Sequence, residues 1–277
     1  MKKFRLIVCI LLLIALFATG CALQSEEDPP SDGALITPEG DDLPAAGDGD
    51  KTSEAEQGFV FLSTVDLSDK TYYAYGDSIT WGYFQSARME KPYPTQVAEL
   101  LRFQSYLNLG ENGATLCANE MGLPNMTERI LSRPYYADVV SVLMGVNDYN
   151  RSLPLGTPSD TDNTTIYGSL YLIMEHFKTY YADSFVFFMT PFDLYLNGHD
   201  GYKNNSQGYN LGDVSTAIKT MAARYGYPVL DLLADGRFEC EMRSAISDGI
   251  HPSQDFFEKH TAPQVAQFIN DHFDSDR

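Results

Sequence analysis

The sequence is poor in basic residues, contains a single tryptophan, and lacks the short motifs that bind metal ions. Its 19 lysines and arginines are outnumbered by 38 aspartates and glutamates, so the formal charge is −19 at pH 7. An excess of negative charge repels phosphate groups, which argues against nucleic acid and anionic lipid headgroups as partners. Neither a CxxC nor an HExxH spacing occurs, so we expect no metal ion and no other cofactor.

Long apolar runs are also scarce. The one exception is the 13 residues from Leu6 to Ala18, which are too few to span a bilayer comfortably. Lys2, Lys3 and Arg5 precede this run and small residues follow it, so residues 1–21 are predicted to be an export signal. A short, uncleaved membrane anchor is the alternative.

Residues 16–21, LFATGC, resemble a bacterial lipoprotein box, in which cleavage leaves Cys21 as a lipid-modified N-terminus. Several acyl chains on one residue anchor a protein stably, whereas a single chain does not. We therefore expect lipidation of Cys21, with the rest of the chain exported and anchored on the extracytoplasmic side of the bacterial membrane. The alternative is an ordinary secreted protein in which Cys21 is incidental.

The composition changes twice along the remaining chain. Residues 22–57 contain 11 acidic residues, one basic residue, four prolines and no aromatic residue. Such a segment cannot bury enough apolar surface to offset its ordering entropy, so it is predicted to be a disordered tether. Residues 58–277 contain 15 basic and 27 acidic residues, a formal charge of −12, and are long enough for one domain with a sizeable core.

Two cysteines, Cys117 and Cys240, lie in the predicted domain. A disulfide between them is allowed outside the cytosol, because that environment is oxidising. Two buried free thiols are the alternative, since their separation in the sequence does not show that they meet.

Short β-rich runs alternate with helical patterns in this domain, which predicts an α/β fold with a parallel sheet covered on both faces. The predicted strands are Thr71–Tyr75, Ser105–Leu109, Val139–Met144, Phe185–Met189 and Val229–Leu232. The predicted helices are Tyr93–Phe103, Met126–Ser132, Ile166–Tyr181, Val214–Tyr225 and Ala262–Phe273. Two long polar loops interrupt the alternation, at 149–163 and 191–208, and loops of this length are often functional.

The first predicted strand, Thr71–Tyr75, leads into the rest of the stretch YYAYGDSITW, residues 72–81. Gly76 and Asp77 follow the strand, and Ser78 is presented at its carboxyl end. Ligands of parallel sheets bind beyond the carboxyl ends of the strands, so Ser78 is placed where chemistry is expected. A reactive serine needs a base, and it needs hydrogen-bond donors for the developing oxyanion.

His251 is the best candidate for the base, because Asp248 lies three residues before it in a predicted loop. A carboxylate in such a turn can accept a hydrogen bond from Nδ1 of the imidazole and leave Nε2 free to take a proton. His199 competes because it also lies in a loop. The remaining histidines of the domain are expected to be satisfied surface residues: His176, His260 and His272.

Two further segments follow predicted strands and offer donors for an oxyanion. The segment after the second predicted strand contains two glycines, Gly110 and Gly113, either of which offers an unobstructed backbone N–H, and Asn147 after the third offers a side-chain N–H. One glycine and Asn147, with the N–H of Ser78, predict an oxyanion hole of three donors.

Together, residues 75–80 (YGDSIT), Gly113, residues 145–148 (GVND) and residues 248–252 (DGIHP) resemble the SGNH, or GDSL-type, ester hydrolase family. The four blocks occur in the family's order across almost the whole domain. The resemblance implies a flavodoxin-like three-layer α/β/α sandwich with a mainly parallel five-stranded sheet. It also implies a Ser78–His251–Asp248 triad, with Ser78, Gly113 and Asn147 in the oxyanion hole.

The expected function is therefore the hydrolysis of carboxylic esters without a cofactor. Loops rich in tyrosine and asparagine suit sugars, and no long apolar lid segment follows residue 60, so we expect removal of acetyl or other short acyl groups from a carbohydrate. A lysophospholipase or lipase acting on lipid esters is one alternative. A non-catalytic glycan-binding lipoprotein is an alternative of another class.

Overall fold

The computed structural model describes residues 63–132, 136–235, 243 and 247–274. The predicted export signal with Cys21 and the predicted tether lie outside the described residues, as does Cys240. Cys117 is a free thiol in the core. Within the described residues, every helix is too short or too polar to cross a bilayer.

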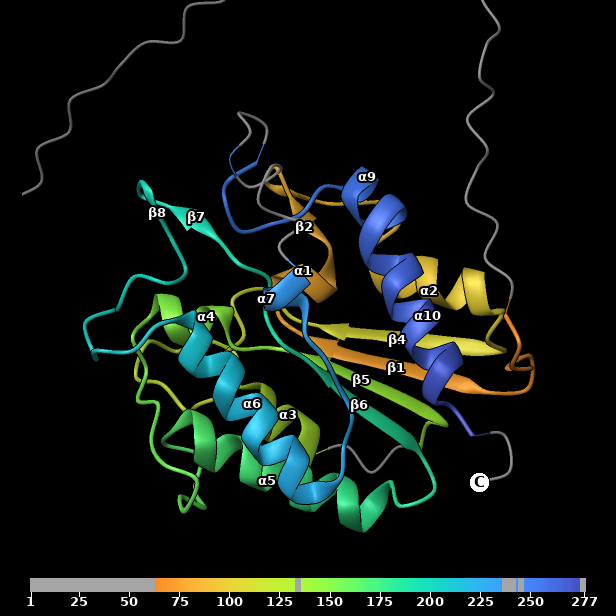
Figure 1. Cartoon of the computed structure of the whole chain (residues 1–277), viewed down its shortest axis with the longest axis horizontal. Coiled ribbons are helices and arrows are strands. Elements are labelled where there is room, and N and C mark those ends of the chain that lie inside the picture. Colours follow the sequence, from red (N-terminus) through yellow and green to blue (C-terminus); the bar gives the residue numbers. More distant parts are fainter. Residues whose placement is uncertain (1–62, 133–135, 236–242, 244–246, 275–277) are drawn as a thin grey trace, which may run out of the picture. The chain divides into compact units, whose positions relative to one another are not determined.

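Five parallel strands form the central sheet, in the order β4-β1-β5-β6-β9 (Figure 1). β1 lies between β4 and β5, so the chain first adds a strand on one side of β1 and then continues on the other side. In parallel sheets, such a reversal of strand order leaves a crevice at the carboxyl ends of the strands. The predicted five-stranded parallel sheet is confirmed. Its strands are β1 (Thr71–Gly76), β4 (Ser105–Gly110), β5 (Val139–Leu143), β6 (Phe185–Met189) and β9 (Val229–Leu230).

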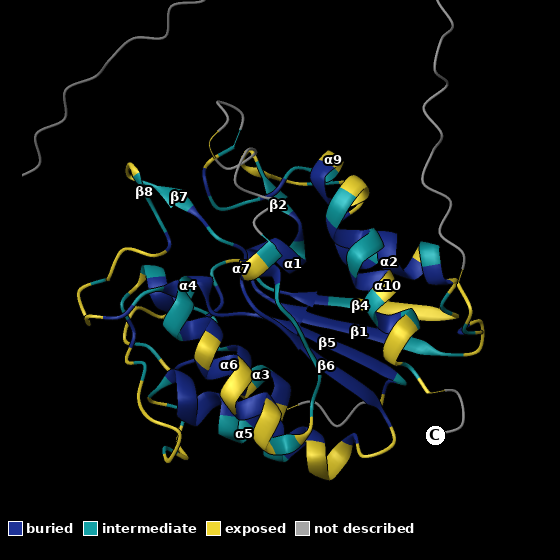
Figure 2. Cartoon of the chain, in the orientation of Figure 1, coloured by how far each residue is buried: buried dark blue, intermediate teal, exposed yellow. Residues whose placement is uncertain are grey.

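Burial explains the strand sequences (Figure 2). Every residue of β5 and of β6 is buried, as expected for central parallel strands covered on both faces. β4 is an edge strand, and its first three residues are exposed while the last two are buried. The buried end of β4 is its carboxyl end, which leads into the loop that carries Gly113.

Helices cover both faces of the sheet (Figure 1), which confirms the three-layer prediction. One face carries α2 (Tyr93–Leu101) and α10 (Ala262–His272), which pack against each other. The other carries α3 (Met126–Leu131), α5 (Ile166–Tyr180) and α6 (Leu211–Tyr225). α6 begins with a capping box between Asn210 and Asp213, in which each side chain accepts a backbone N–H of the other residue.

The last helical segment starts earlier than the sequence pattern predicts. Before α10, the chain already forms α9 (Gln254–Phe256) and a π-helical turn, η1 (Phe257–Thr261). Ser253 caps the start, where its hydroxyl accepts a hydrogen bond from the N–H of Phe256 at 3.1 Å. The predicted helix from Ala262 is confirmed as α10, which begins at that residue, and the helical segment before it was not predicted.

Short elements surround the carboxyl ends of the strands, and most of them have no periodicity that a sequence could reveal. The predicted loop 191–208 contains a hairpin, and the predicted loop 149–163 begins inside a helix. These short elements are α1 (Ser78–Trp81), β2 (Tyr83–Phe84), β3 (Ala87–Arg88), α4 (Val146–Asn150), β7 (Tyr195–Leu196), β8 (His199–Asp200) and α7 (Leu232–Asp235).

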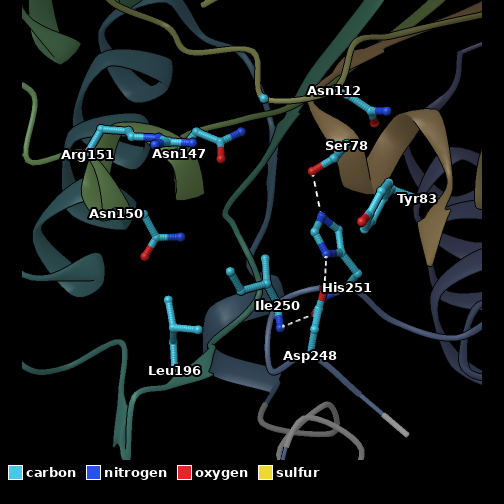
Figure 3. Close-up of a pocket in the computed structure, with 11 residues that line it drawn as sticks. Ser78, Tyr83, Asn112, Asn147, Asn150, Arg151, Leu196, Asp248, Ile250 and His251 are labelled. Carbon is cyan, nitrogen blue, oxygen red and sulfur yellow. Dashed lines mark hydrogen bonds and ion pairs between the residues drawn. The ribbon is translucent and has the colours of Figure 1, made fainter. Parts of the chain in front are cut away.

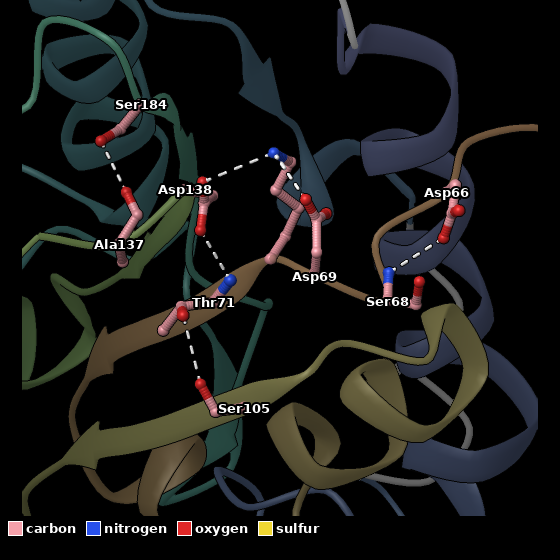
Figure 4. Close-up of polar contacts among 9 residues, drawn as sticks. Asp66, Ser68, Asp69, Thr71, Ser105, Ala137, Asp138 and Ser184 are labelled. Atoms are coloured by element: carbon pink, nitrogen blue, oxygen red, sulfur yellow. Dashed lines mark hydrogen bonds and ion pairs between the residues drawn. The ribbon is translucent and has the colours of Figure 1, made fainter.

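Polar contacts join the amino ends of the strands (Figure 4). The Asp138 carboxylate accepts a hydrogen bond from the N–H of Thr71 at 2.8 Å, and the hydroxyls of Thr71 and Ser105 are 3.1 Å apart. The Ser184 hydroxyl donates to the carbonyl of Ala137 at 2.6 Å. The first two contacts connect β1 to β5 and β4, and the third connects β5 to β6. They help to fix the register of the strands, and the register aligns their carboxyl ends.

One expected surface histidine is not on the surface. His176 lies in α5 with only 8% of its surface exposed, and its ring packs near Phe177 and Tyr180. The helical pattern places one face of α5 in the core, and His176 lies at the margin of that face. Of the other two, His260 is partly exposed and His272 is exposed, as expected.

Candidate active site

Ser78 is held at the end of β1 by an abrupt change from strand to helix. Asp77 caps α1, and its carboxylate accepts a hydrogen bond from the N–H of Ile79 at 2.9 Å. The turn is so tight that a Cβ on Gly76 would lie 1.9 Å from the hydroxyl oxygen of Thr80. Only glycine fits there, and the consequence is a serine fixed as the first residue of α1.

The loop before α9 brings the imidazole of His251 to this serine (Figure 3). Nε2 of His251 lies 2.7 Å from Oγ of Ser78, and Nδ1 of His251 lies 2.7 Å from Oδ2 of Asp248. The other carboxylate oxygen of Asp248 accepts the backbone N–H groups of Ile250 and His251, at 3.0 and 2.9 Å. The carboxylate therefore fixes both the backbone of the loop and the orientation of the imidazole.

The electrostatics of this group favour an ionised Asp248. Partial burial alone would raise the pKa of Asp248, but the hydrogen bonds and charge of His251 outweigh it and lower the pKa to about 2. The ring of Tyr83 packs against the His251 ring, with centroids 4.6 Å apart. The imidazole is thus held between a carboxylate, a serine and an aromatic ring.

The two expected oxyanion donors face the same space as Ser78. Gly113 and Asn147 both line the cavity beside it. The Asn147 amide donates one hydrogen to the carbonyl of Ala114 at 2.9 Å, which leaves its second N–H for a ligand. Gly110, the other glycine of this segment, gives its N–H to the side chain of Asn108 instead.

A buried carboxylate joins the two donor loops. Asp148 is fully buried and accepts hydrogen bonds from the N–H groups of Leu116 and Cys117, each at 3.0 Å. Burial raises the pKa of Asp148, and these two hydrogen bonds oppose the shift. Asp148 thus fixes the distance between the loop of Gly113 and the helix of Asn147.

The sequence profile of the GDSL-like Lipase/Acylhydrolase family matches residues 74–257, about two thirds of the chain. The chain belongs to this family. It is an enzyme of the GDSL/SGNH type, whose members hydrolyse carboxylic esters. The comparison with curated proteins finds no match.

Several solved structures share the fold of this acylhydrolase. A protein from Lactobacillus plantarum is 27% identical, with a TM-score of 0.64 over 75% of this chain and 99% of that one. A possible lipase from Chitinophaga pinensis is 23% identical, with a TM-score of 0.59 over 73% and 98% of the two chains. A carbohydrate acetylesterase family member from Sinorhizobium meliloti is 17% identical, with a TM-score of 0.51 over 72% and 97%.

The cavity beside Ser78 has a volume of about 470 Å³ and gathers residues from six separate segments. Sequence reasoning missed Tyr83 and most of the wall opposite His251. Ile250 lies inside the predicted block DGIHP, but the resemblance gave it no role. The other missed side chains lie outside the four blocks, although Asn150 and Arg151 come two and three residues after GVND. The missed lining residues are Tyr83, Asn112, Asn150, Arg151, Leu196 and Ile250.

His199, the competing candidate for the base, lies elsewhere in the acylhydrolase. It belongs to β8, and its Nδ1 lies 3.3 Å from the backbone carbonyl of Asp200. Among the described residues, those that line the Ser78 cavity do not include His199. Its loop does contribute to the site, but through Leu196.

Proposed function

We propose that this acylhydrolase hydrolyses short-chain esters with Ser78 as the nucleophile and His251 as the general base. The observation that carries the proposal is the continuous chain of contacts from Ser78 Oγ to His251 to Asp248, with both distances at 2.7 Å. A hydroxyl within hydrogen-bond reach of an oriented imidazole is the arrangement that activates serine for attack on a carbonyl.

The reaction then proceeds in two stages. Ser78 Oγ attacks the ester carbonyl while His251 Nε2 takes its proton, and His251 returns that proton to the leaving alcohol as the C–O bond breaks. Water, deprotonated by His251, attacks the acyl-enzyme and releases the acid and Ser78. Asp248 holds the imidazole and stabilises its positive charge.

The oxyanion of each tetrahedral intermediate is assigned to three donors: the N–H groups of Ser78 and Gly113, and the free N–H of Asn147. The bond from Asn147 to Ala114 supports this assignment, because it fixes the amide before the substrate arrives. Loss of one such donor costs on the order of 3 kcal/mol of transition-state stabilisation.

The proposed substrate is a carbohydrate that carries acetyl or other short acyl groups. The cavity wall offers three asparagine amides, which hydrogen-bond to hydroxyl groups, and Tyr83, whose ring can contact a sugar face. Among the described lining residues, Leu196 and Ile250 are the aliphatic ones, and so small an aliphatic lining favours a short acyl chain. The structural relative named as a carbohydrate acetylesterase family member is consistent with this choice.

The proposed location is outside the cytoplasmic membrane, with Cys21 as the lipid anchor. This part of the proposal rests on the sequence of residues 1–21.

Ser78→Ala and His251→Ala test the proposed chemistry. We expect each to lower kcat/KM on p-nitrophenyl acetate by at least about 10³-fold, because each removes a member of one proton-transfer chain. Ser132→Ala and His272→Ala are matched controls, since both residues are exposed and make only local contacts.

Near-wild-type turnover by a folded Ser78→Ala protein would refute the assignment. Labelling by a fluorophosphonate probe separates the enzyme from a non-catalytic glycan-binding protein, because only an activated serine reacts. Rates on acetate and octanoate esters separate a short-chain esterase from a lipase, and a preference for octanoate would overturn the proposed acyl specificity.

A further inference from the structure

Among the described residues that line the Ser78 cavity, Arg151 is the one with a permanent positive charge, on its guanidinium. Within the described part of the chain, this guanidinium has neither an ion pair nor a hydrogen bond. The acid among the described lining residues is Asp248, and its carboxylate is already bound to His251. The charge of Arg151 is therefore available to a ligand.

The composition of the domain makes an unpaired arginine informative. Acidic residues outnumber basic ones by 27 to 15 in residues 58–277, so carboxylate partners are abundant. The nearest acid along the chain, Asp148, is buried and directed at the N–H groups of Leu116 and Cys117. Among the described residues, no carboxylate forms an ion pair with the guanidinium of Arg151, which is an exposed residue.

The backbone of Arg151 is fixed by the same elements that position the proposed oxyanion donor. Arg151 ends α4, and its N–H donates to the carbonyl of Asn147 at 2.9 Å. The single hydrogen of the Tyr209 hydroxyl is shared between the carbonyls of Asp148 and Leu153, whose oxygens lie 3.1 and 2.7 Å from the hydroxyl oxygen, and Tyr209 so contacts both ends of this segment. The base of the side chain is therefore placed by a rigid scaffold.

The neighbours of Arg151 in the cavity suit a polar ligand that also carries an anion. Figure 3 shows Asn150 and Arg151 on the opposite side of the cavity from His251. A guanidinium presents a planar fork of N–H donors that matches the two oxygens of a carboxylate. The amide of Asn150 adds both a donor and an acceptor beside it.

We propose that Arg151, assisted by Asn150, binds a carboxylate of the substrate, so that the preferred substrate is a short-chain ester of a carboxylate-bearing carbohydrate. The inference rests on the proposed hydrolysis of esters at Ser78 and names the class of sugar that is deacylated. Arg151 determines specificity in this scheme and takes no part in proton transfer.

The test compares two substrates that differ only in this charge, O-acetylated methyl glucuronoside and O-acetylated methyl glucoside, with the full chain as the enzyme. We expect the wild type to prefer the glucuronoside in kcat/KM by at least about tenfold. Arg151→Gln should reduce that preference about tenfold or more, and Arg151→Lys, which keeps the charge but loses the fork, should give an intermediate value.

Arg102→Gln is the matched control for net charge. Arg102 is exposed at the end of α2 and lines other cavities, so its removal should leave the preference unchanged. An equal loss of preference in Arg102→Gln would show that long-range charge causes the effect and would overturn the proposal. So would an Arg151→Gln protein that keeps the wild-type preference.

Binding to an inactive protein separates this inference from the proposed chemistry. We expect methyl glucuronoside, titrated calorimetrically into Ser78→Ala, to bind at least about tenfold more tightly than to Ser78→Ala/Arg151→Gln. Equal affinities would refute the carboxylate subsite even if Ser78 is the nucleophile. Undiminished esterase activity in Ser78→Ala would refute the proposed function, while the binding difference would still test Arg151.

Discussion

Asp77 precedes Ser78 in the chain and Asp248 contacts His251, and their surroundings shift the pKa values of these carboxyl groups in opposite directions. Burial raises the pKa of Asp77 to about 7, although the N–H of Ile79 and the charge of His251 oppose the shift. The hydrogen bonds from His251 lower that of Asp248 to about 2 against the effect of burial. Asp248 is therefore ionised throughout the working range, whereas Asp77 changes charge near neutrality.

The raised pKa of Asp77 predicts a stability that depends on pH. The folded protein holds this proton more tightly than the unfolded chain, whose aspartate has a pKa near 3.8, so the free energy of unfolding should fall as the pH rises from about 4 to 7. The expected fall is on the order of 4 kcal/mol, because the pKa rises from 3.8 to about 7 and each pKa unit corresponds to about 1.4 kcal/mol. The lowered pKa of Asp248 acts only below about pH 4, where its stabilisation is lost, so the two effects do not overlap.

Asp77→Asn should reduce this slope, because asparagine keeps an oxygen to accept the Ile79 N–H but cannot ionise. Asp148, whose pKa burial also raises, keeps its own contribution in the variant. Urea unfolding of the wild type and the variant between pH 4.5 and 8 measures it. Parallel curves of unfolding free energy against pH would contradict the assignment to Asp77.

At the scale of elements, the hairpin of β7 and β8 braces the loop that carries Asp248 and His251. The N–H of Tyr195 donates to the carbonyl of Gly249 at 2.8 Å. A Cβ on Gly249 would lie only 1.8 Å from the carbonyl oxygen of Tyr195, and the φ of Gly249 is +82°. The hairpin and the loop also contribute Leu196 and Ile250 to the cavity, so one contact positions both the base and part of the substrate wall.

Gly249→Ala should therefore impair catalysis more than it impairs folding. Separation of the hairpin from the loop shifts His251 relative to Ser78, and a displacement of about 1 Å can cost 10²-fold in rate. We expect kcat/KM on p-nitrophenyl acetate to fall at least about tenfold.

Gly198→Ala is the matched control for this change. Gly198 has a φ of +81°, but no atom lies within 4 Å of the position of a Cβ. An alanine at 198 would therefore carry the same backbone strain of about 1–2 kcal/mol as an alanine at 249, without a collision with a neighbouring carbonyl oxygen. Equal losses of activity in the two variants would show that strain, and not the contact with Tyr195, is responsible.

At the scale of the whole molecule, the proposed location of the enzyme rests on the sequence of residues 1–21. If Cys21 is lipidated, wild-type protein should partition into the detergent phase in Triton X-114, and Cys21→Ser should move to the aqueous phase. Cys9→Ser is the matched control, because Cys9 lies within the apolar run that cleavage removes. A Cys21→Ser protein that still partitions with detergent would refute the lipoprotein assignment.

The sequence by itself determined the sheet, the long helices and the position of Ser78. Short apolar runs such as VVSVL at 139–143 predict buried strands, because the composition and the length of a run are local properties of the chain. A serine or a glycine directly after such a strand lies at the carboxyl edge of the sheet, whichever strand is its neighbour. That rule, with the resemblance of four blocks, was enough to choose Ser78 and His251.

Only the tertiary structure decided the shape and the charge of the site. Arg151 and Leu196 are 45 residues apart and line one cavity, and the collision that requires glycine at position 249 comes from Tyr195. The pKa of Asp77 depends on burial by the whole fold, which no local pattern encodes. Burial and contact between distant segments are collective properties, so the sequence could indicate candidate residues at the strand ends but not the cavity wall and the charges that surround them.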